Sequence, residues 1–285
     1  MEEKANDAET LNNMFLQDAG IGIPEVTERD MAGLILEHLD YEQQLIAISG
    51  LLQRNAEADK RVDAAMKELD EYARKSSGWR NERAMEEFGV TFYLSVYQSA
   101  AHSMAALGML APMYESMFYQ AFQGIRTRYF VTAGISSDHH RCKMTDPESF
   151  WNCHYHYERK TTVVTENLVS GILQLAKAVG LKKHLPDGLP RMLEALFDYR
   201  NFMFHNGFEW PRERCKEFAA HVEQKSWQAW FSNSTRGGEP WIFFMTEEFI
   251  IHCFDMIHRL LDGFGAYCRG RVSVETIPVE QVPDE

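Results

Sequence analysis

Three residues in one short segment have the side chains that chemistry on a phosphodiester requires: Arg200, Asn201 and His205. A histidine exchanges protons near neutral pH, whereas an arginine holds two phosphate oxygens with its planar guanidinium. Cleaving RNA without a metal needs a base for the 2′-hydroxyl and a cation that stabilises charge on the phosphate. We therefore predict His205 as the acid or base, Arg200 as the phosphate ligand, and Asn201 as the residue that orients the phosphate or the imidazole.

The segment 199–207 reads Tyr-Arg-Asn-Phe-Met-Phe-His-Asn-Gly and resembles the signature of the HEPN superfamily. The resemblance extends over about 113–222, but only 199–207 matches a motif. It implies a helical bundle, and for many members a metal-independent endoribonuclease with a toxin or defence role and a site assembled across a dimer. The implied products are a 2′,3′-cyclic phosphate and a 5′-hydroxyl. In one toxin variant of the family a modified tyrosine lies two residues after the histidine, where this chain has Gly207, so that form of antitoxin control is not expected.

Helix geometry restricts how the motif can work. Five residues of a continuous helix turn by about 500°, which leaves Arg200 and His205 about 140° apart. Either the helix ends inside the motif, as Asn206-Gly207 suggests, or two copies of the chain meet at a twofold axis. A homodimer is thus an implied partner, together with RNA and an antitoxin or other regulatory protein.

Two other interpretations of the motif stay open. Cationic side chains near a helix C-terminus are stabilising without any catalytic role. A family-like but inactive site would make the chain a non-catalytic nucleotide-binding, RNA-binding or protein-interaction scaffold of the same fold.

A second group of reactive residues lies in the polar segment 134–160, where zinc-ligand side chains are concentrated. The weak metal candidates are His139, His140, Cys142, Cys153, His154 and His156. Their spacing lacks the close cysteine pairs of structural zinc sites, so we predict a solvated loop and no cofactor. RNA contact through His140, Arg141 and Lys143 is a further alternative.

Other cations and aromatic residues are candidates for binding RNA. Arg126 and Arg128 adjoin an apolar helix face, and Lys182 and Lys183 begin a stretch with more basic than acidic residues. Trp227, Trp230, Phe231 and Trp241 could stack bases, but core packing or a subunit interface is the favoured interpretation.

Composition places the chain among globular intracellular proteins. Hydrophobic residues make up 45% and charged residues 25% of the 285 residues, which is enough for a sizeable core. The acidic, polar start is not a secretory signal, and five cysteines suggest reduced thiols, so we expect a cytoplasmic protein without a membrane span. The formal net charge of −13 does not favour nucleic-acid binding overall, but a local phosphate site remains compatible with it.

Hydrophobic periodicity predicts seven to nine helices and almost no strand. Expected helices begin after Thr27 and near Tyr41, and further ones cover about 82–110, 113–131, 164–179 and 190–206. Another follows Pro211, and the last starts at the Thr246 N-cap and closes at Gly263. Pro112 suits the first turn of its helix, and Val90–Leu110 is expected to be a central buried helix. The aromatic stretch 227–245 with Gly237-Gly238 predicts a small hairpin or loop.

These patterns predict an all-α, HEPN-like antiparallel helical bundle. The expected parts are a flexible leader (1–26), an N-terminal helical extension (27–78), a bundle domain carrying the motif (79–270) and a tail (271–285). The leading functional hypothesis is a dimeric, metal-independent endoribonuclease. The alternatives are the non-catalytic scaffold and a metal-dependent helical protein that uses the His/Cys segment.

Overall fold

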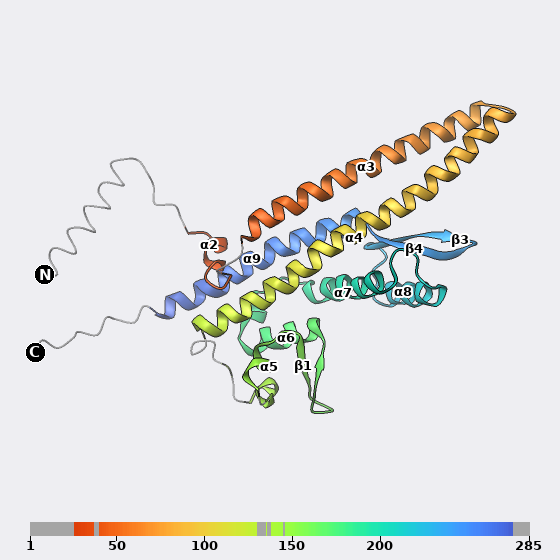
Figure 1. Ribbon diagram of the computed structural model, residues 1–285. Helices are drawn as coiled ribbons and strands as arrows, with labels where there is room; N and C mark the ends of the chain where they lie inside the picture. The colour runs from red at the N-terminus through yellow and green to blue at the C-terminus, as the bar shows by residue number, and fades with distance from the viewer. Residues whose placement is uncertain (1–25, 37–39, 130–134, 136–137, 145, 276–285) are drawn as a thin grey trace, which may run out of the picture.

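The computed structural model describes residues 26–36, 40–129, 135, 138–144 and 146–275, without the side chains of 272–275. This part of the chain is mostly helical and contains two small antiparallel hairpins, which confirms the predicted all-α class (Figure 1). The elements in order are α2 (Glu28–Ala32), α3 (Tyr41–Lys75), α4 (Trp79–Tyr129), η1 (His140–Lys143), α5 (Pro147–Trp151), β1 (Tyr155–Glu158), β2 (Val163–Glu166), α6 (Leu168–Ala178), η2 (Leu181–His184), α7 (Leu189–Asn206), α8 (Arg212–Gln224), β3 (Phe231–Arg236), β4 (Glu239–Met245) and α9 (Glu247–Glu275). None of the helices in these ranges is long and apolar enough to cross a membrane.

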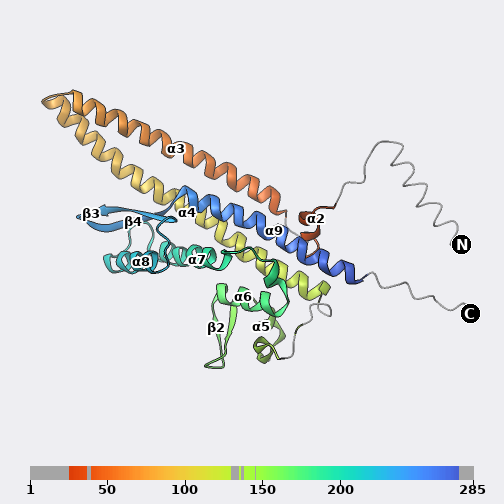
Figure 2. The same ribbon diagram turned by 180° about the vertical axis from the view of Figure 1, so that it is seen from behind.

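Helices α3 and α4 form a long antiparallel hairpin whose closed end extends away from the rest of the molecule (Figures 1 and 2). The predicted break at Pro112 is wrong, because α4 is one helix from Trp79 to Tyr129 with Pro112 inside it. A proline in a helix interior costs a backbone hydrogen bond. Here Leu110, Ala111, Met113 and Tyr114 are buried on either side of the exposed proline, so packing outweighs that cost.

The expectation that Val90–Leu110 is buried throughout is also wrong. Leu107 and Leu110 are fully buried, but Val90 is 66% exposed and Leu94 53% exposed on the part of α4 that extends with the hairpin. Periodicity identified the helix correctly. It could not show that this end of α4 packs against α3 and β4 and leaves the rest of its surface exposed.

The main core lies where the second half of α4 packs with α6, α7 and α9. Buried tyrosines tie these layers together, since the Tyr114 hydroxyl donates to the Cys253 carbonyl at 2.6 Å and the Tyr199 hydroxyl donates to the Phe243 carbonyl at 2.9 Å. The predicted end of the last helix at Gly263 is wrong, because α9 continues to Glu275 and includes the first residues of the expected tail. Gly263 lies against the backbone of His184, so it permits close packing rather than ending the helix.

The predicted aromatic hairpin is confirmed: β3 and β4 pair from Phe231–Met245 to Arg236–Glu239 around Gly237 and Gly238, both at positive φ. The hairpin β1–β2 was not predicted. The predicted helix start at Val164 is wrong, because Val164 lies in β2 and α6 starts only after Asn167, whose side chain accepts a hydrogen bond from the Ser170 amide. Apart from Val26, the expected leader lies outside the described residues, as do positions 276–285.

Candidate functional site

The motif residues lie on the continuous helix α7, which begins after Gly188 and ends at Gly207, both at positive φ. The interpretation that the helix ends inside the motif is therefore wrong. Arg200 and Asn201 line a groove, whereas His205 is exposed one turn further on and does not line it. No residue in the described ranges forms a hydrogen bond or ion pair with His205.

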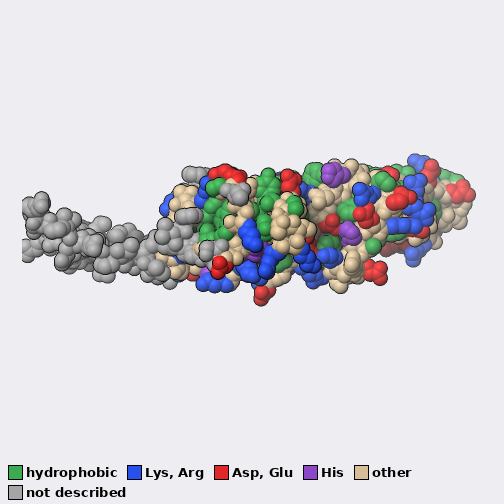
Figure 3. Space-filling view, turned by 90° about the horizontal axis from the view of Figure 1, so that it is seen from below, with side chains coloured by type: hydrophobic (Ala, Val, Ile, Leu, Met, Phe, Trp, Pro, Cys, Tyr) green, Lys and Arg blue, Asp and Glu red, His purple; other side chains and the backbone are tan. Residues whose placement is uncertain are grey.

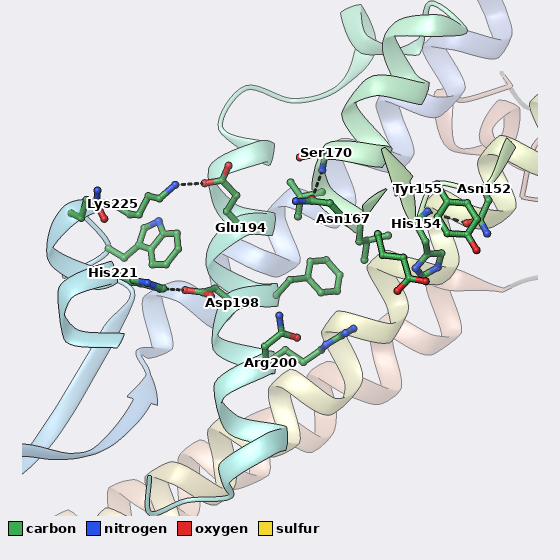
Figure 4. Close-up of a pocket in the computed structure, with 17 residues that line it drawn as sticks. Asn152, His154, Tyr155, Asn167, Ser170, Glu194, Asp198, Arg200, His221 and Lys225 are labelled. Carbon is green, nitrogen blue, oxygen red and sulfur yellow. Dashed lines mark hydrogen bonds and ion pairs between the residues drawn. The ribbon is translucent and has the colours of Figure 1, made fainter. Parts of the chain in front are cut away.

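The groove has a volume of about 830 Å³ and runs across one face of α7 (Figure 4). One wall comes from the segment around β1 and β2 and from the start of α6, and the opposite wall comes from α8. Its lining residues are Asn152, His154, Tyr155, Glu166, Asn167, Leu168, Val169, Ser170, Glu194, Phe197, Asp198, Arg200, Asn201, His221, Gln224, Lys225 and Trp227.

At one end of the groove, Arg200 contacts Glu115 of α4 and Phe197 of its own helix. Its Nη1 lies 3.1 Å from Glu115 Oε2, and the other carboxylate oxygen of Glu115 lies 3.3 Å from His154 Nε2. The guanidinium also lies over the ring of Phe197, 5.1 Å from its centre. The Arg200 and Glu115 side chains are about one-third exposed (36% and 32%), and Arg200 lines the groove, so a ligand there can reach its guanidinium.

At the other end, a carboxylate on α7 orients an imidazole on α8. His221 Nδ1 lies 2.7 Å from Asp198 Oδ2, which leaves Nε2 of the same ring to exchange protons with a ligand. Lys225 lies one turn further on, at the C-cap of α8, and pairs with Glu194 at 3.2 Å. Figure 4 shows His221 and His154 at opposite ends, with Asp198 and Arg200 between them.

The charge of the groove depends on its histidines. Three carboxylates (Glu166, Glu194 and Asp198) face two permanent cations (Arg200 and Lys225) among the lining residues. Protonation of both His154 and His221 would change this excess of one negative charge into an excess of one positive charge. The groove is thus suited to an anionic ligand only when its imidazoles carry protons or its carboxylates remain paired.

The four cations predicted to bind RNA do not line the groove. Arg126 is held by Glu148 through two hydrogen bonds of 2.9 and 2.6 Å, and this pairing lowers the pKa of the Glu148 carboxyl. Arg128, Lys182 and Lys183 are exposed at the end of α4 and in η2. In the view from below, Lys and Arg side chains are mixed with Asp and Glu side chains at the end of the molecule opposite the grey segments (Figure 3).

The His/Cys segment does not converge on a metal site in the described part of the chain, where no metal-like group of three or more ligands occurs. His139 stacks on His140 with ring centres 4.3 Å apart, and burial lowers the pKa of both imidazoles. Cys153 is fully buried, and burial raises its pKa to about 12, whereas Cys142 is exposed. His156 lies on β1, and His154 belongs to the groove.

Arg141, an alternative RNA contact in the sequence, is instead fully buried, so that interpretation is wrong. Its guanidinium donates to the carbonyls of Phe150 (2.6 Å), Asn152 (2.6 Å) and Tyr155 (2.7 Å). Burial lowers the pKa of Arg141 to about 10. These bonds fix the segment that carries Asn152, His154 and Tyr155 into the groove, so Arg141 supports one wall from behind.

The sequence did not identify His221, Lys225 or Glu115 as site residues. The spacing of His221 and Lys225, four residues apart on one predicted helix, was the available signal for a shared face. Their meeting with α7 is a tertiary contact, and Glu115 lies 85 positions before Arg200.

Trp227 and Phe231 are buried core residues, 2% and 4% exposed, and Trp230 is covered on one side by Phe249. Trp241 packs edge-on against Tyr93 and Tyr97.

Comparison of the chain with protein families, with curated proteins and with solved structures gave no match.

Proposed function

We propose that this chain is a metal-independent endoribonuclease of the HEPN type whose RNA strand lies in the groove along α7. One observation carries the proposal: two motif residues, Arg200 and Asn201, share a groove with an imidazole that a carboxylate holds by one nitrogen. An open groove with polar groups at both ends suits a chain of nucleotides better than a compact metabolite.

Within one chain, we assign the proton transfer to His221. Its Nε2 would accept the 2′-hydroxyl proton while the 2′-oxygen bonds to phosphorus and the bond from phosphorus to the 5′-oxygen breaks. The 5′-oxygen takes a proton from the imidazolium, and the products are a 2′,3′-cyclic phosphate and a 5′-hydroxyl. Lys225 stabilises the phosphorane charge, and Arg200 and Asn201 hold a neighbouring phosphate.

His205 remains a second proposal for the proton transfer, and it requires a homodimer. The imidazole is exposed and does not line the groove of its own chain, so it would act on RNA only where a second copy brings Arg200 beside it.

The test is cleavage of a fluorescent single-stranded RNA in the presence of a chelator. We expect the wild type to leave 2′,3′-cyclic phosphate ends, and Arg200→Ala and His221→Ala to lower the rate by about 100-fold or more. His205→Ala is the matched control for the single-chain arrangement and should retain activity. Loss of activity only in His205→Ala would transfer the proton-transfer role to the dimer.

The second candidate is a non-catalytic RNA-binding or protein-interaction scaffold, favoured by the acidic groups Glu115, Glu194 and Asp198, each of which pairs with a groove cation or imidazole. Wild-type protein that binds RNA in the groove but leaves a broad set of RNAs intact would establish this function instead.

A further inference from the structure

Glu115 is an unusual charge in its surroundings. Between Phe88 and Ile125 of α4 it is the only Asp, Glu, Lys or Arg, and its neighbours Tyr114, Met117 and Phe118 are buried in the main core. Removing a carboxylate from water costs free energy unless the group is paired. The two partners of Glu115 should therefore explain why the helix carries a charge at this position.

Those partners are the groove residues Arg200 and His154, which approach the two oxygens of the same carboxylate at 3.1 and 3.3 Å. They come from α7 and from the segment before β1, whereas Glu115 itself does not line the groove. A guanidinium and an imidazole that converge on adjacent anionic oxygens form the donor set that also binds two oxygens of a phosphate.

We propose that Arg200 and His154 form a phosphate subsite, and that Glu115 acts as an internal anion that occupies it until an RNA phosphate takes its place. The proposal rests on the proposed function for the nature of the ligand. Arg200 and His154 each have a second support that survives the exchange: Phe197 lies under the guanidinium, and the Arg141 bonds hold the backbone around His154. Glu115 has no third partner in the described residues, so it can turn away without breaking another bond.

The exchange is energetically feasible because the ion pairs are accessible to water. The side chains of Arg200, His154 and Glu115 are 36%, 39% and 32% exposed. Ion pairs at such positions contribute little net free energy, so removing the internal competitor should strengthen phosphate binding by about threefold to fivefold.

The experiment measures binding of a short fluorescein-labelled 2′-O-methyl RNA by anisotropy, because this probe has phosphates but no free 2′-hydroxyl and cannot be cleaved. We expect Glu115→Gln to bind more tightly than wild type and Arg200→Gln to bind more weakly. In an Arg200→Gln background, Glu115→Gln should give no gain. Glu115→Asp keeps the charge but shortens the side chain, so tighter RNA binding by this variant cannot come from a change in net charge.

Glu239→Gln is the matched control, because Glu239 also joins two cations, Arg212 at 2.8 Å and Lys216 at 3.5 Å, outside the groove. An equal gain in Glu239→Gln, or no gain in either Glu115 variant with folding confirmed by circular dichroism, overturns the proposal. Failure of the nuclease assignment is a separate result: wild type that leaves natural RNA uncut, with the Glu115→Gln binding gain intact, removes the cleavage step and keeps the phosphate subsite.

Discussion

At the scale of single residues, Asp198 has the most specific role in the groove, because it binds Nδ1 of His221 and so determines which nitrogen faces the ligand. Asp198→Asn should lower the rate of RNA cleavage by about tenfold or more, since an amide can donate to Nδ1 and favour the wrong tautomer. The measurement is the initial cleavage rate. Asp59→Asn, which makes the same change in the 3.1 Å pair with His102 away from the groove, should leave the rate unchanged. Equal losses in both variants would contradict a role for Asp198 in the reaction.

Arg141 shows a purely structural use of a charge. It is fully buried and satisfied by backbone carbonyls and by Gln174, whose side-chain oxygen lies 3.2 Å from Nη1. Arg141→Met should lower the free energy of unfolding by about 3 kcal/mol or more, because several buried carbonyls lose their donor. Chemical denaturation measures the loss. Arg159→Met, on the exposed β1–β2 turn, serves as control, and a similar small change in both variants would refute this account.

At the scale of elements, α4 shows what periodicity can and cannot predict. Its apolar repeat gave the helix on both sides of Pro112, but local rules placed a boundary there because an interior proline lacks a backbone donor. Whether buried neighbours compensate depends on α7 and α9, which are distant in sequence.

The motif could be predicted from the sequence, whereas the groove could not. Arg200 and Asn201 lie within one helix, whereas His221, His154 and Glu115 reach them only through the packing of three other segments.

Replacing Pro112 tests that balance. The proline is exposed and its neighbours are packed, so Pro112→Ala should restore one helical hydrogen bond and raise the melting temperature by a few degrees. Pro190→Ala provides the control, because Pro190 lies in the first turn of α7, where no intrahelical donor is needed. A lower melting temperature for Pro112→Ala would mean that the core depends on a local distortion of α4 at the proline.

At the scale of the whole molecule, three partly buried imidazoles make stability depend on pH. Burial lowers the pKa of His139, His140 and His184, so these rings stay neutral in the folded protein below the pH at which they take up protons in the unfolded chain. The unfolded state then binds more protons, and the free energy of unfolding should fall as the pH drops below about 6.5, the ordinary histidine pKa. Urea titrations at pH 7.5, 6.5 and 5.5 measure this decline.

Three carboxyl groups add a further loss of stability only at more acidic pH, below the ordinary carboxyl range. Hydrogen bonds lower the pKa values of Asp30, Asp146 and Glu148. The His184→Gln variant should therefore show a shallower slope between pH 6.5 and 5.5 than wild type, and an unchanged slope would exclude this ring as a source of the pH dependence.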